Sequence, residues 1–254
     1  MELNGSGSIQ RIKLDSTVST NEWLKQNPSP DSNCPVRVVT AEYQSGGKGQ
    51  AGNVWESADG KNLLFSIGFR PDFVDAGKQF VLSEAIALSI AETVSAIPEI
   101  DAGDIAIKWP NDIYWKDLKL AGILIENSLL GKNVADCIAG AGLNVNQEVF
   151  LSDAPNPVSI RNITGHDTDR EPLLESIVGR FLDYCRLVSS GGNGIIHDRY
   201  MEHLYRRNGY HGFTDACGSF SAAISDVLPE GILVLKDRSG KERKYEFKQI
   251  SYIM

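Results

Sequence analysis

Residues 105–126 read Ile-Ala-Ile-Lys-Trp-Pro-Asn-Asp-Ile-Tyr-Trp-Lys-Asp-Leu-Lys-Leu-Ala-Gly-Ile-Leu-Ile-Glu, and this stretch carries a strong β-sheet signal. Its apolar and aromatic runs at 105–109, 113–115 and 120–126 predict three strands, with a turn before the third. Lys119 follows Asp112 by seven residues, so the hairpin returns it toward the same place. The stretch therefore predicts part of a sheet with polar side chains gathered at one point.

Strand and helix signals alternate on both sides of this stretch. Ser19-Thr20-Asn21-Glu22 matches a capping box with Ser19 as the N-cap, which predicts a short helix that ends before Pro28. Further strands are predicted at 36–43, 62–69 and 134–139, and further helices at 75–97, 172–188 and 195–205. This mixture predicts an α+β fold with helices on one side of a mixed β-sheet.

The pattern changes after Arg206-Arg207-Asn208-Gly209. Short β-like runs follow at 218–227, 231–236 and 244–250, with turn residues between them. These runs predict a small β-barrel of about 45 residues. The sequence thus predicts two domains, residues 1–208 and residues 209–254.

Composition and charge exclude several classes of protein. Of the 254 residues 42% are hydrophobic and 23% charged, which is ordinary for a soluble globular protein and excludes a disordered or fibrous one. The net charge of −8 provides no overall basic field for nucleic acid or anionic lipid. No secretory signal or membrane span is visible. The four cysteines form no C-x-x-C pair, which argues against a zinc ribbon and favours the reducing cytoplasm.

The glycine-rich loop at residues 46–52 is the first candidate ligand site. Gly47-Lys48-Gly49-Gln50-Ala51-Gly52 matches G-x-G-x-x-G, but residues 53–60 lead into another strand instead of the helix that a dinucleotide-binding fold requires. This context argues against NAD binding. The loop can still present N–H groups to an anion, with Lys48 adding a charge. The alternative is a flexible hairpin tip with a solvated lysine.

Polar side chains after residue 107 form the second candidate. Lys108, Trp109, Asn111 and Asp112 can grip a nucleotide by charge, ring stacking, hydrogen bonds to a base and a Mg²⁺ ion. The alternative is a structural corner with the tryptophan in the core and the lysine on the surface. Likewise, the amides of Gly140-Ala-Gly-Leu-Asn-Val-Asn146 suit either an adenine edge or an Asx turn.

Four motifs, in this order, resemble the catalytic domain of the biotin–protein ligases. They are Ser19-Thr20-Asn21 before a helix, Gln44 with the loop 47–55, Lys108-Trp-Pro-Asn-Asp112 with Lys119-Leu-Ala-Gly-Ile-Leu124, and the segment 140–146. The similarity spans about residues 12–146, and the β-rich tail resembles the family's SH3-like C-terminal domain. The resemblance implies a mixed β-sheet packed with helices, of the class II aminoacyl-tRNA-synthetase-like type.

The resemblance also implies a two-step reaction. Biotin and MgATP give biotinyl-AMP and pyrophosphate, and a lysine of a carboxylase's biotin carboxyl carrier domain then attacks the mixed anhydride. Lys119 would be catalytic, since it draws the carboxylate and the α-phosphate together, and Asp112 would hold Mg²⁺. The implied biotin-binding residues are Ser19, Thr20, Asn21, Gln44, Lys48, Gly49, Gln50, Lys119 and Gly122. The implied residues for ATP and the adenylate are Gly47, Trp55, Lys108, Asn111, Asp112 and Asn144.

The sequence departs from the family pattern at the glycine loop. The family commonly has G-R-G-R-x-G-R-x-W, whereas this chain has Lys48, Gln50 and Asn53 at the arginine positions, which changes the hold on the adenylate. About a dozen residues precede the first motif, too few for the helix-turn-helix domain of some relatives, so gene repression is not expected. The alternatives are a lipoate–protein ligase and a non-catalytic sensor of biotin or of the adenylate. The sequence leaves monomer and homodimer equally open.

Overall fold

A seven-stranded β-sheet forms the centre of the molecule. The computed structural model describes residues 9–28, 36–49, 52–152 and 156–253. The strands are β1 (Gln10–Thr17), β2 (Val36–Gln44), β3 (Leu63–Phe69), β4 (Ile105–Lys108), β5 (Asp112–Trp115), β6 (Leu118–Leu130) and β7 (Asn133–Leu143). Their order is β1-β2-β3-β7-β6-β5-β4, and all neighbours are antiparallel except β1 and β2. The predicted mixed sheet is confirmed.

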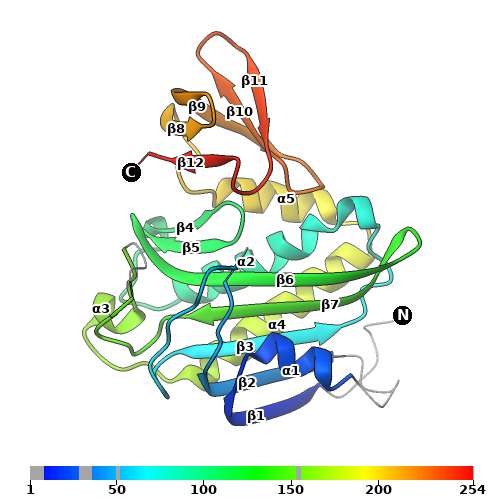
Figure 1. The fold of residues 1–254 in the computed structure, drawn as a ribbon, viewed down its shortest axis with the longest axis vertical. Coiled ribbons are helices and arrows are strands. Elements are labelled where there is room, and N and C mark those ends of the chain that lie inside the picture. The colour runs from blue at the N-terminus through cyan, green and yellow to red at the C-terminus, as the bar shows by residue number, and fades with distance from the viewer. Residues whose placement is uncertain (1–8, 29–35, 50–51, 153–155, 254) are drawn as a thin grey trace.

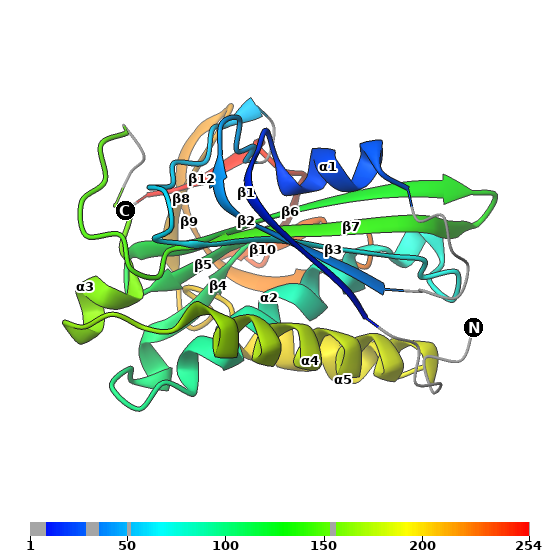
Figure 2. The same ribbon diagram turned by 90° about the horizontal axis from the view of Figure 1, so that it is seen from below.

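Helices cover both faces of this sheet. One face carries α2 (Phe80–Ser95), α4 (Arg170–Ser189) and α5 (Asn193–Glu202), and the opposite face carries α1 (Thr20–Gln26), as Figures 1 and 2 show. The prediction that all helices lie on one side is therefore wrong for α1. Its Leu24 packs directly on Gly68 of β3, where the missing side chain leaves room for the helix. Within the described ranges no helix is long and apolar enough to cross a bilayer.

The long helix α2 is the centre of the hydrophobic core. It packs against the sheet on one side and against α4 and α5 on the other, so nearly all of its side chains are buried. A helix that is apolar around its whole circumference is suited to such a position. The predicted helix 75–97 starts with a separate 3₁₀ turn, η2 (Ala76–Lys78), in which the Asp75 carboxylate accepts a hydrogen bond from the Gly77 N–H.

The C-terminal residues form a second, five-stranded antiparallel sheet. Its strands are β8 (His211–Asp215), β9 (Gly218–Val227), β10 (Leu233–Asp237), β11 (Glu242–Tyr245) and β12 (Ile250–Tyr252), in the order β11-β10-β9-β8-β12. In Figure 1 it lies beside α5, β4 and β5. Trp109 Nε1 donates to the Gly231 carbonyl at 3.0 Å, which ties the two sheets together. The domain boundary at residues 208 and 209 stays a prediction.

Two local predictions differ from the structure, and three elements lie outside the predicted set. Ser19 precedes α1 as expected, but its side chain makes no capping hydrogen bond, and Glu22 instead pairs with Lys48 and Lys25. The run 244–250 is divided between β11 and β12. The strands β1 and β8 and the helix α3 (Ile160–Thr164) carry no clear apolar period, because each is short or has mostly accessible side chains.

A histidine joins the helices α2 and α5 to the C-terminal sheet through a buried and a half-buried carboxylate. His197 of α5 places Nδ1 2.9 Å from Glu84 Oε1 on α2 and Nε2 3.0 Å from Asp226 Oδ1 on β9. The hydrogen bond to Glu84 is the main cause that raises the pKa of His197 to about 9; both carboxylate charges add to it, and partial burial opposes it. An imidazolium that donates from both nitrogens is therefore the stable form at neutral pH.

This contact predicts a loss of stability in mild alkali. Because the folded-state pKa lies above the unfolded value of about 6.5, the stabilisation is complete below that value and is lost as the pH rises through 9. Urea unfolding at pH 6.5 and 9.5 should show that the wild type loses about 1–2 kcal/mol more than His197→Gln, a figure reduced for solvent screening of a partly exposed group. Equal losses in the two proteins would show that His197 is not the titrating group.

Candidate active site

A cavity of about 550 Å³ lies against β6 and β7 on the face that carries α1, and residues 48–49, residues 53–55 and β12 complete its walls. Most residues singled out from the sequence line it. They are Ser19, Thr20, Asn21, Gln44, Lys48, Gly49, Trp55, Lys108, Asn111, Asp112, Lys119 and Gly122. The described lining residues include four lysines, Lys48, Lys108, Lys119 and Lys248, and one carboxylate, that of Asp112. In a chain of net charge −8, this local positive charge suits an anionic ligand.

Two predicted residues do not line the cavity, and a third has no described position. Gly47 and Asn144 are not among the lining residues, and Gln50 lies outside the described residues. Asn144 is buried, and its Nδ2 donates to the Val158 carbonyl at 3.0 Å. Asn144 thus fastens the segment after residue 156 to the end of β7. Its contact with an adenine stays a prediction, as does the adenylate contact of Gly47.

Hydrogen bonds fix the polar end of the cavity. Gln44 Oε1 accepts from the backbone N–H of Thr20 at 2.7 Å. Ser66 Oγ lies 2.7 Å from Thr20 Oγ1 and 2.6 Å from Asn21 Oδ1. Asn21 Nδ2 donates to Glu126 Oε2 at 2.9 Å. A connected network in dry surroundings presents donors and acceptors at fixed positions, which suits a polar head such as a cyclic urea.

Two members of this network, Ser66 and Glu126, are absent from the sequence-based prediction. Ser66 is fully buried in β3, whose other residues are apolar or glycine. Glu126 ends the apolar part of β6. The available signal was a polar residue inside an otherwise apolar strand, because a buried polar group needs a partner. The sequence alone does not show that the partner is Asn21.

Glycines let side chains lie directly on the sheet. Gly122 and Gly142 are paired neighbours on β6 and β7. A Cβ atom at Gly142 would lie 2.4 Å from the Trp55 indole nitrogen, and one at Gly122 would lie 2.8 Å from Trp55 Cζ3. A Cβ atom at Gly140 would lie 2.0 Å from Asn21 Oδ1. The close approach of Trp55 and Asn21 therefore requires glycine at these places.

Lys119 is fixed through its side chain and its backbone. Its Nζ lies 2.8 Å from Asp112 Oδ1 and 5.7 Å from the centre of the Trp55 ring. Its N–H donates to the Asn156 carbonyl at 2.8 Å, and its carbonyl accepts from the Val158 N–H at 3.0 Å. The hairpin of β5 and β6 thus brings Lys119 back to Asp112, as predicted. Its ammonium is the best placed cation between the two ends of the cavity.

The glycine loop is a hairpin, as its context predicts. Lys48 and Val54 form an antiparallel bridge, and the Trp55 N–H donates to the Gly47 carbonyl at 2.9 Å. No helix follows the last glycine, which agrees with the argument against NAD binding. Lys48 Nζ lies 3.2 Å from Glu22 Oε2 of α1. This ion pair draws the described part of the loop toward the helix that carries Asn21.

The segment after β7 is joined to the loop that carries Trp55. Glu56 accepts hydrogen bonds from the N–H groups of Leu151 and Ser152, each at 2.8 Å. The same segment pairs further along with the backbone of Lys119. Two of the candidate ligand contacts, Trp55 and Lys119, are therefore connected through one stretch of chain.

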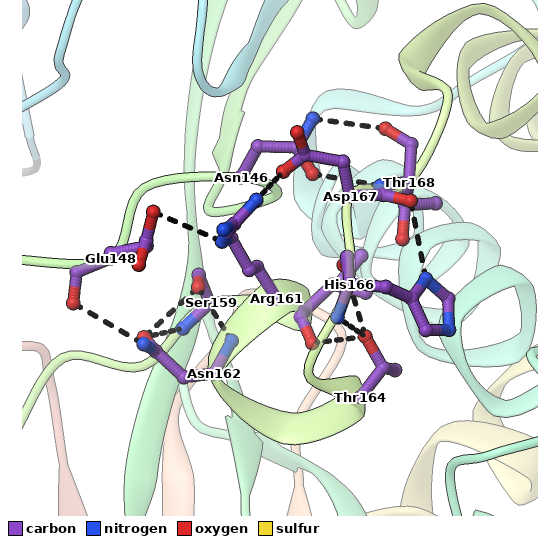
Figure 3. Close-up of polar contacts among 10 residues, drawn as sticks. Asn146, Glu148, Ser159, Arg161, Asn162, Thr164, His166, Asp167 and Thr168 are labelled. Atoms are coloured by element: carbon purple, nitrogen blue, oxygen red, sulfur yellow. Dashed lines mark hydrogen bonds and ion pairs between the residues drawn. The ribbon is translucent and has the colours of Figure 1, made fainter.

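The helix α3 anchors the start of this segment. Figure 3 shows Arg161 between Glu148, at 3.1 Å, and Asp167. Asn162 Nδ2 donates to the Glu148 carbonyl at 3.2 Å. Ser159 caps α3 by accepting from the Asn162 N–H at 3.1 Å. These contacts hold Glu148 against α3, close to the point where the chain leaves β7.

The described residues contain no group of three or more His, Cys, Asp or Glu side chains that could hold a metal ion by themselves. Asp112 is the one carboxylate among the described lining residues, and one of its oxygens already pairs with Lys119. This donor set fits Mg²⁺ only as a companion of phosphate, since Mg²⁺ in such sites takes one or two carboxylates together with substrate oxygens.

Comparisons with known proteins agree with this geometry. Residues 9–144 match the biotin/lipoate A/B protein ligase family. The chain is 31% identical over 250 residues to the bifunctional ligase/repressor BirA of Bacillus subtilis, covering 96% of this chain and 74% of that protein. It is 29% identical over 239 residues to the biotin–acetyl-CoA-carboxylase ligase of Paracoccus denitrificans, covering 90% and 95%. The biotin protein ligase of Aquifex aeolicus, solved with biotin and ATP, has the same fold, with a TM-score of 0.77 at 23% identity over 95% of this chain and 97% of that one.

The fold, the cavity and these matches define the class of protein: the chain belongs to the biotin/lipoate A/B protein ligase family. Within that class it is a biotin–protein ligase, an ATP-using enzyme. The expectation drawn from the four sequence motifs is confirmed at this level. The roles of individual residues stay predictions, because they rest on geometry alone.

Proposed function

We propose that this enzyme converts biotin and ATP to biotinyl-AMP and then transfers the biotinyl group to a lysine of a carboxylase's biotin carboxyl carrier domain. One observation carries the proposal. A single cavity has the fixed network of Thr20, Asn21 and Gln44 at one end and the ammonium group of Lys108 at the other, with the ammonium group of Lys119 between them. The first end suits the ureido ring of biotin, and the two ammonium groups suit a carboxylate beside phosphates.

In the first step, Lys119 acts on the reacting atoms. Its ammonium attracts the biotin carboxylate and the α-phosphate, two anions that otherwise repel each other. As the carboxylate oxygen attacks the α-phosphorus, pyrophosphate leaves, and the cation stabilises the negative charge on the transferring group. Asp112 keeps the Nζ of Lys119 in place before the ligands arrive. Trp55 covers the ligand from the loop side.

The nucleotide end of the site is assigned to Lys108, Asn111 and Asp112. Asn111 Nδ2 donates to the Ile123 carbonyl at 2.8 Å, so its amide oxygen is left for a ligand. Asp112 would hold Mg²⁺ together with phosphate oxygens, and the ion would neutralise charge on the leaving pyrophosphate. Burial is the main cause that lowers the pKa of Lys108, and the charge of Lys119 lowers it further. A phosphate near Lys108 would favour its charged form.

In the second step, the amine of the carrier lysine attacks the carbonyl carbon of biotinyl-AMP, and AMP leaves. The cytoplasm, where carboxylases and ATP are present, is the proposed location. The proposed catalytic part is residues 1–208, with residues 209–254 as an SH3-like companion. Lipoate is disfavoured because the relative from Paracoccus denitrificans is a biotin–acetyl-CoA-carboxylase ligase and the polar end of the cavity suits a urea rather than an apolar dithiolane ring.

The test is pyrophosphate release by the purified chain with MgATP and either biotin or lipoate. Pyrophosphate release that occurs with biotin and not with lipoate supports the first step. Biotin labelling of an added carrier domain supports the second step. Release with lipoate at an equal rate contradicts the substrate assignment. Binding of biotin without pyrophosphate release would show a sensor rather than an enzyme. Omission of Mg²⁺ should abolish release if the metal accompanies the phosphates.

A further inference from the structure

The side chain of Lys108 lies between two tyrosine rings that belong to different sheets. Its Nζ donates to the Tyr114 hydroxyl at 2.9 Å and lies 4.5 Å from the centre of that ring, on β5. It also lies 5.2 Å from the centre of the Tyr252 ring, on β12. A cation near the face of an aromatic ring is attracted by the ring quadrupole, and the attraction is stronger away from water. The C-terminal sheet thus supplies half of the niche for this ammonium group.

Tyr252 is held firmly in place. Its backbone pairs with Phe213 of β8, and the two ring centres are 5.0 Å apart. Its ring centre also lies 5.9 Å from that of Tyr205, which in turn lies 5.3 Å from that of Tyr114. These contacts join the niche to the interior of the C-terminal sheet. A ring packed between two aromatic neighbours on a paired strand limits where the Lys108 ammonium can rest.

The hydroxyl of Tyr252 takes no part in this arrangement. It is buried and has no hydrogen-bond partner within the described part of the chain. Burying an unpaired hydroxyl costs free energy, so the hydroxyl does not explain why tyrosine stands here. The ring is the part of the side chain that contacts the lysine. Phenylalanine should therefore serve in its place.

The charged groups around Lys108 make its position matter. Burial lowers the pKa of Lys108, the charges of Lys119 and Arg206 lower it further, and Asp112 opposes them. An ammonium under these influences drifts toward water unless something holds it. The tyrosine niche keeps it at the wall of the cavity that also contains Lys119 and Asp112.

We propose that Tyr252 is a positioning residue of the reaction: its ring holds the Lys108 ammonium at the nucleotide end of the cavity, so the C-terminal sheet takes part in ATP binding. This proposal rests on the proposed function, in which Lys108 contacts the nucleotide. In this proposal the C-terminal sheet contributes to the first step by positioning Lys108.

The experiment compares Tyr252→Phe, Tyr252→Leu and Tyr252→Met with the control Tyr210→Leu. The control also removes a tyrosine ring from a cation, since Arg238 lies 4.4 Å from the Tyr210 ring centre, but Tyr210 is not among the described residues that line the cavity. Trace acetylation of the folded proteins across a pH series, read by mass spectrometry of the Lys108 peptide, reports the proton affinity and accessibility of that amine without any turnover. Steady-state kinetics give KM for ATP and for biotin separately.

We expect Tyr252→Phe and Tyr210→Leu to match the wild type in both readouts. In Tyr252→Leu and Tyr252→Met no ring holds the amine at the cavity wall, so its accessibility to acetylation should move toward that of exposed lysines in the same digest. KM for ATP should rise by about tenfold, because the cation–π contact that holds Lys108 at the nucleotide end is lost. KM for biotin should stay within about twofold, because the biotin end of the cavity is unchanged. Thermal melting identifies any variant that is unfolded, and the methionine variant keeps the apolar volume.

Two results overturn the proposal and differ in what else they imply. If acetylation of Lys108 is unchanged in folded Tyr252→Leu and Tyr252→Met, the ring does not hold the lysine, and the proposed function is unaffected. If acetylation changes but KM for ATP does not, Lys108 is not a nucleotide contact. That result removes both this proposal and the assignment of Lys108 under the proposed function, while biotin activation itself is judged by pyrophosphate release.

Discussion

Lys119→Ala is expected to slow biotinyl-AMP formation by a factor on the order of 10²–10³, with the fold intact. The structure places the Lys119 ammonium 2.8 Å from Asp112 and beside Trp55, inside the cavity and between its two ends. Removing one preorganised cation from a site that must join two anions loses both attraction in the complex and stabilisation of the transition state. The rate should fall much more than the affinity for biotin alone.

The measurement is single-turnover pyrophosphate release with saturating biotin and MgATP. Lys116→Ala is a matched control, because Lys116 lies in the same hairpin and also pairs with an aspartate, Asp104, at 3.3 Å, but it is not among the cavity residues. The control should keep the wild-type rate. Lys119→Arg should recover part of the rate if charge is what matters. A wild-type rate in a folded Lys119→Ala protein would remove Lys119 from the catalytic step.

The residues that meet at the cavity were largely predictable from the sequence, because each stands next to a strong local signal. The pairing of β5 with β6 follows from two apolar runs around a turn, and it carries Lys119 back to Asp112. The resemblance to the biotin–protein ligases, carried by the order of these motifs, then gave the residues their expected roles. Neither source predicted Ser66, because its role depends on the packing of α1 on β3, which brings Thr20 and Asn21 to its hydroxyl.

The placement of helices and the partners of buried side chains could not be predicted, because tertiary packing determines them. Helix α1 lies on the face opposite α2 because Gly68 offers it a flat place, and a glycine in a strand is equally typical of a bulge or a sharp bend. The resemblance assigns Asn144 to the adenylate, which stays a prediction, and no local pattern indicates the hydrogen bond from its Nδ2 to the Val158 carbonyl. The niche of Lys108 is formed by Tyr114 and Tyr252, which lie about 138 residues apart in the sequence, so no local pattern indicates it.

Gly140→Ala is expected to weaken biotin binding by a factor on the order of 10²–10³. The added methyl group would lie 2.0 Å from Asn21 Oδ1, 2.8 Å from its Cγ and 3.1 Å from its Nδ2, so Asn21 has to leave its place. Its bonds to Ser66 and to Glu126 would break together. Each buried polar group left without a partner costs about 1–3 kcal/mol, and two such losses give the expected factor.

Isothermal titration with biotin tests this, with Gly179→Ala as the control, since a Cβ atom there meets nothing within 4 Å. The control lies in α4 and should bind biotin as the wild type does, with equal or higher stability. The double variant Asn21→Ala with Gly140→Ala separates the two parts of the effect. Removing the asparagine side chain relieves the clash, so the double variant should melt higher than Gly140→Ala. It should still bind biotin weakly, because the polar end of the cavity has lost its central amide. Wild-type affinity in Gly140→Ala would show that Asn21 is not a biotin contact, and recovery of affinity in the double variant would show that the clash alone had closed the site.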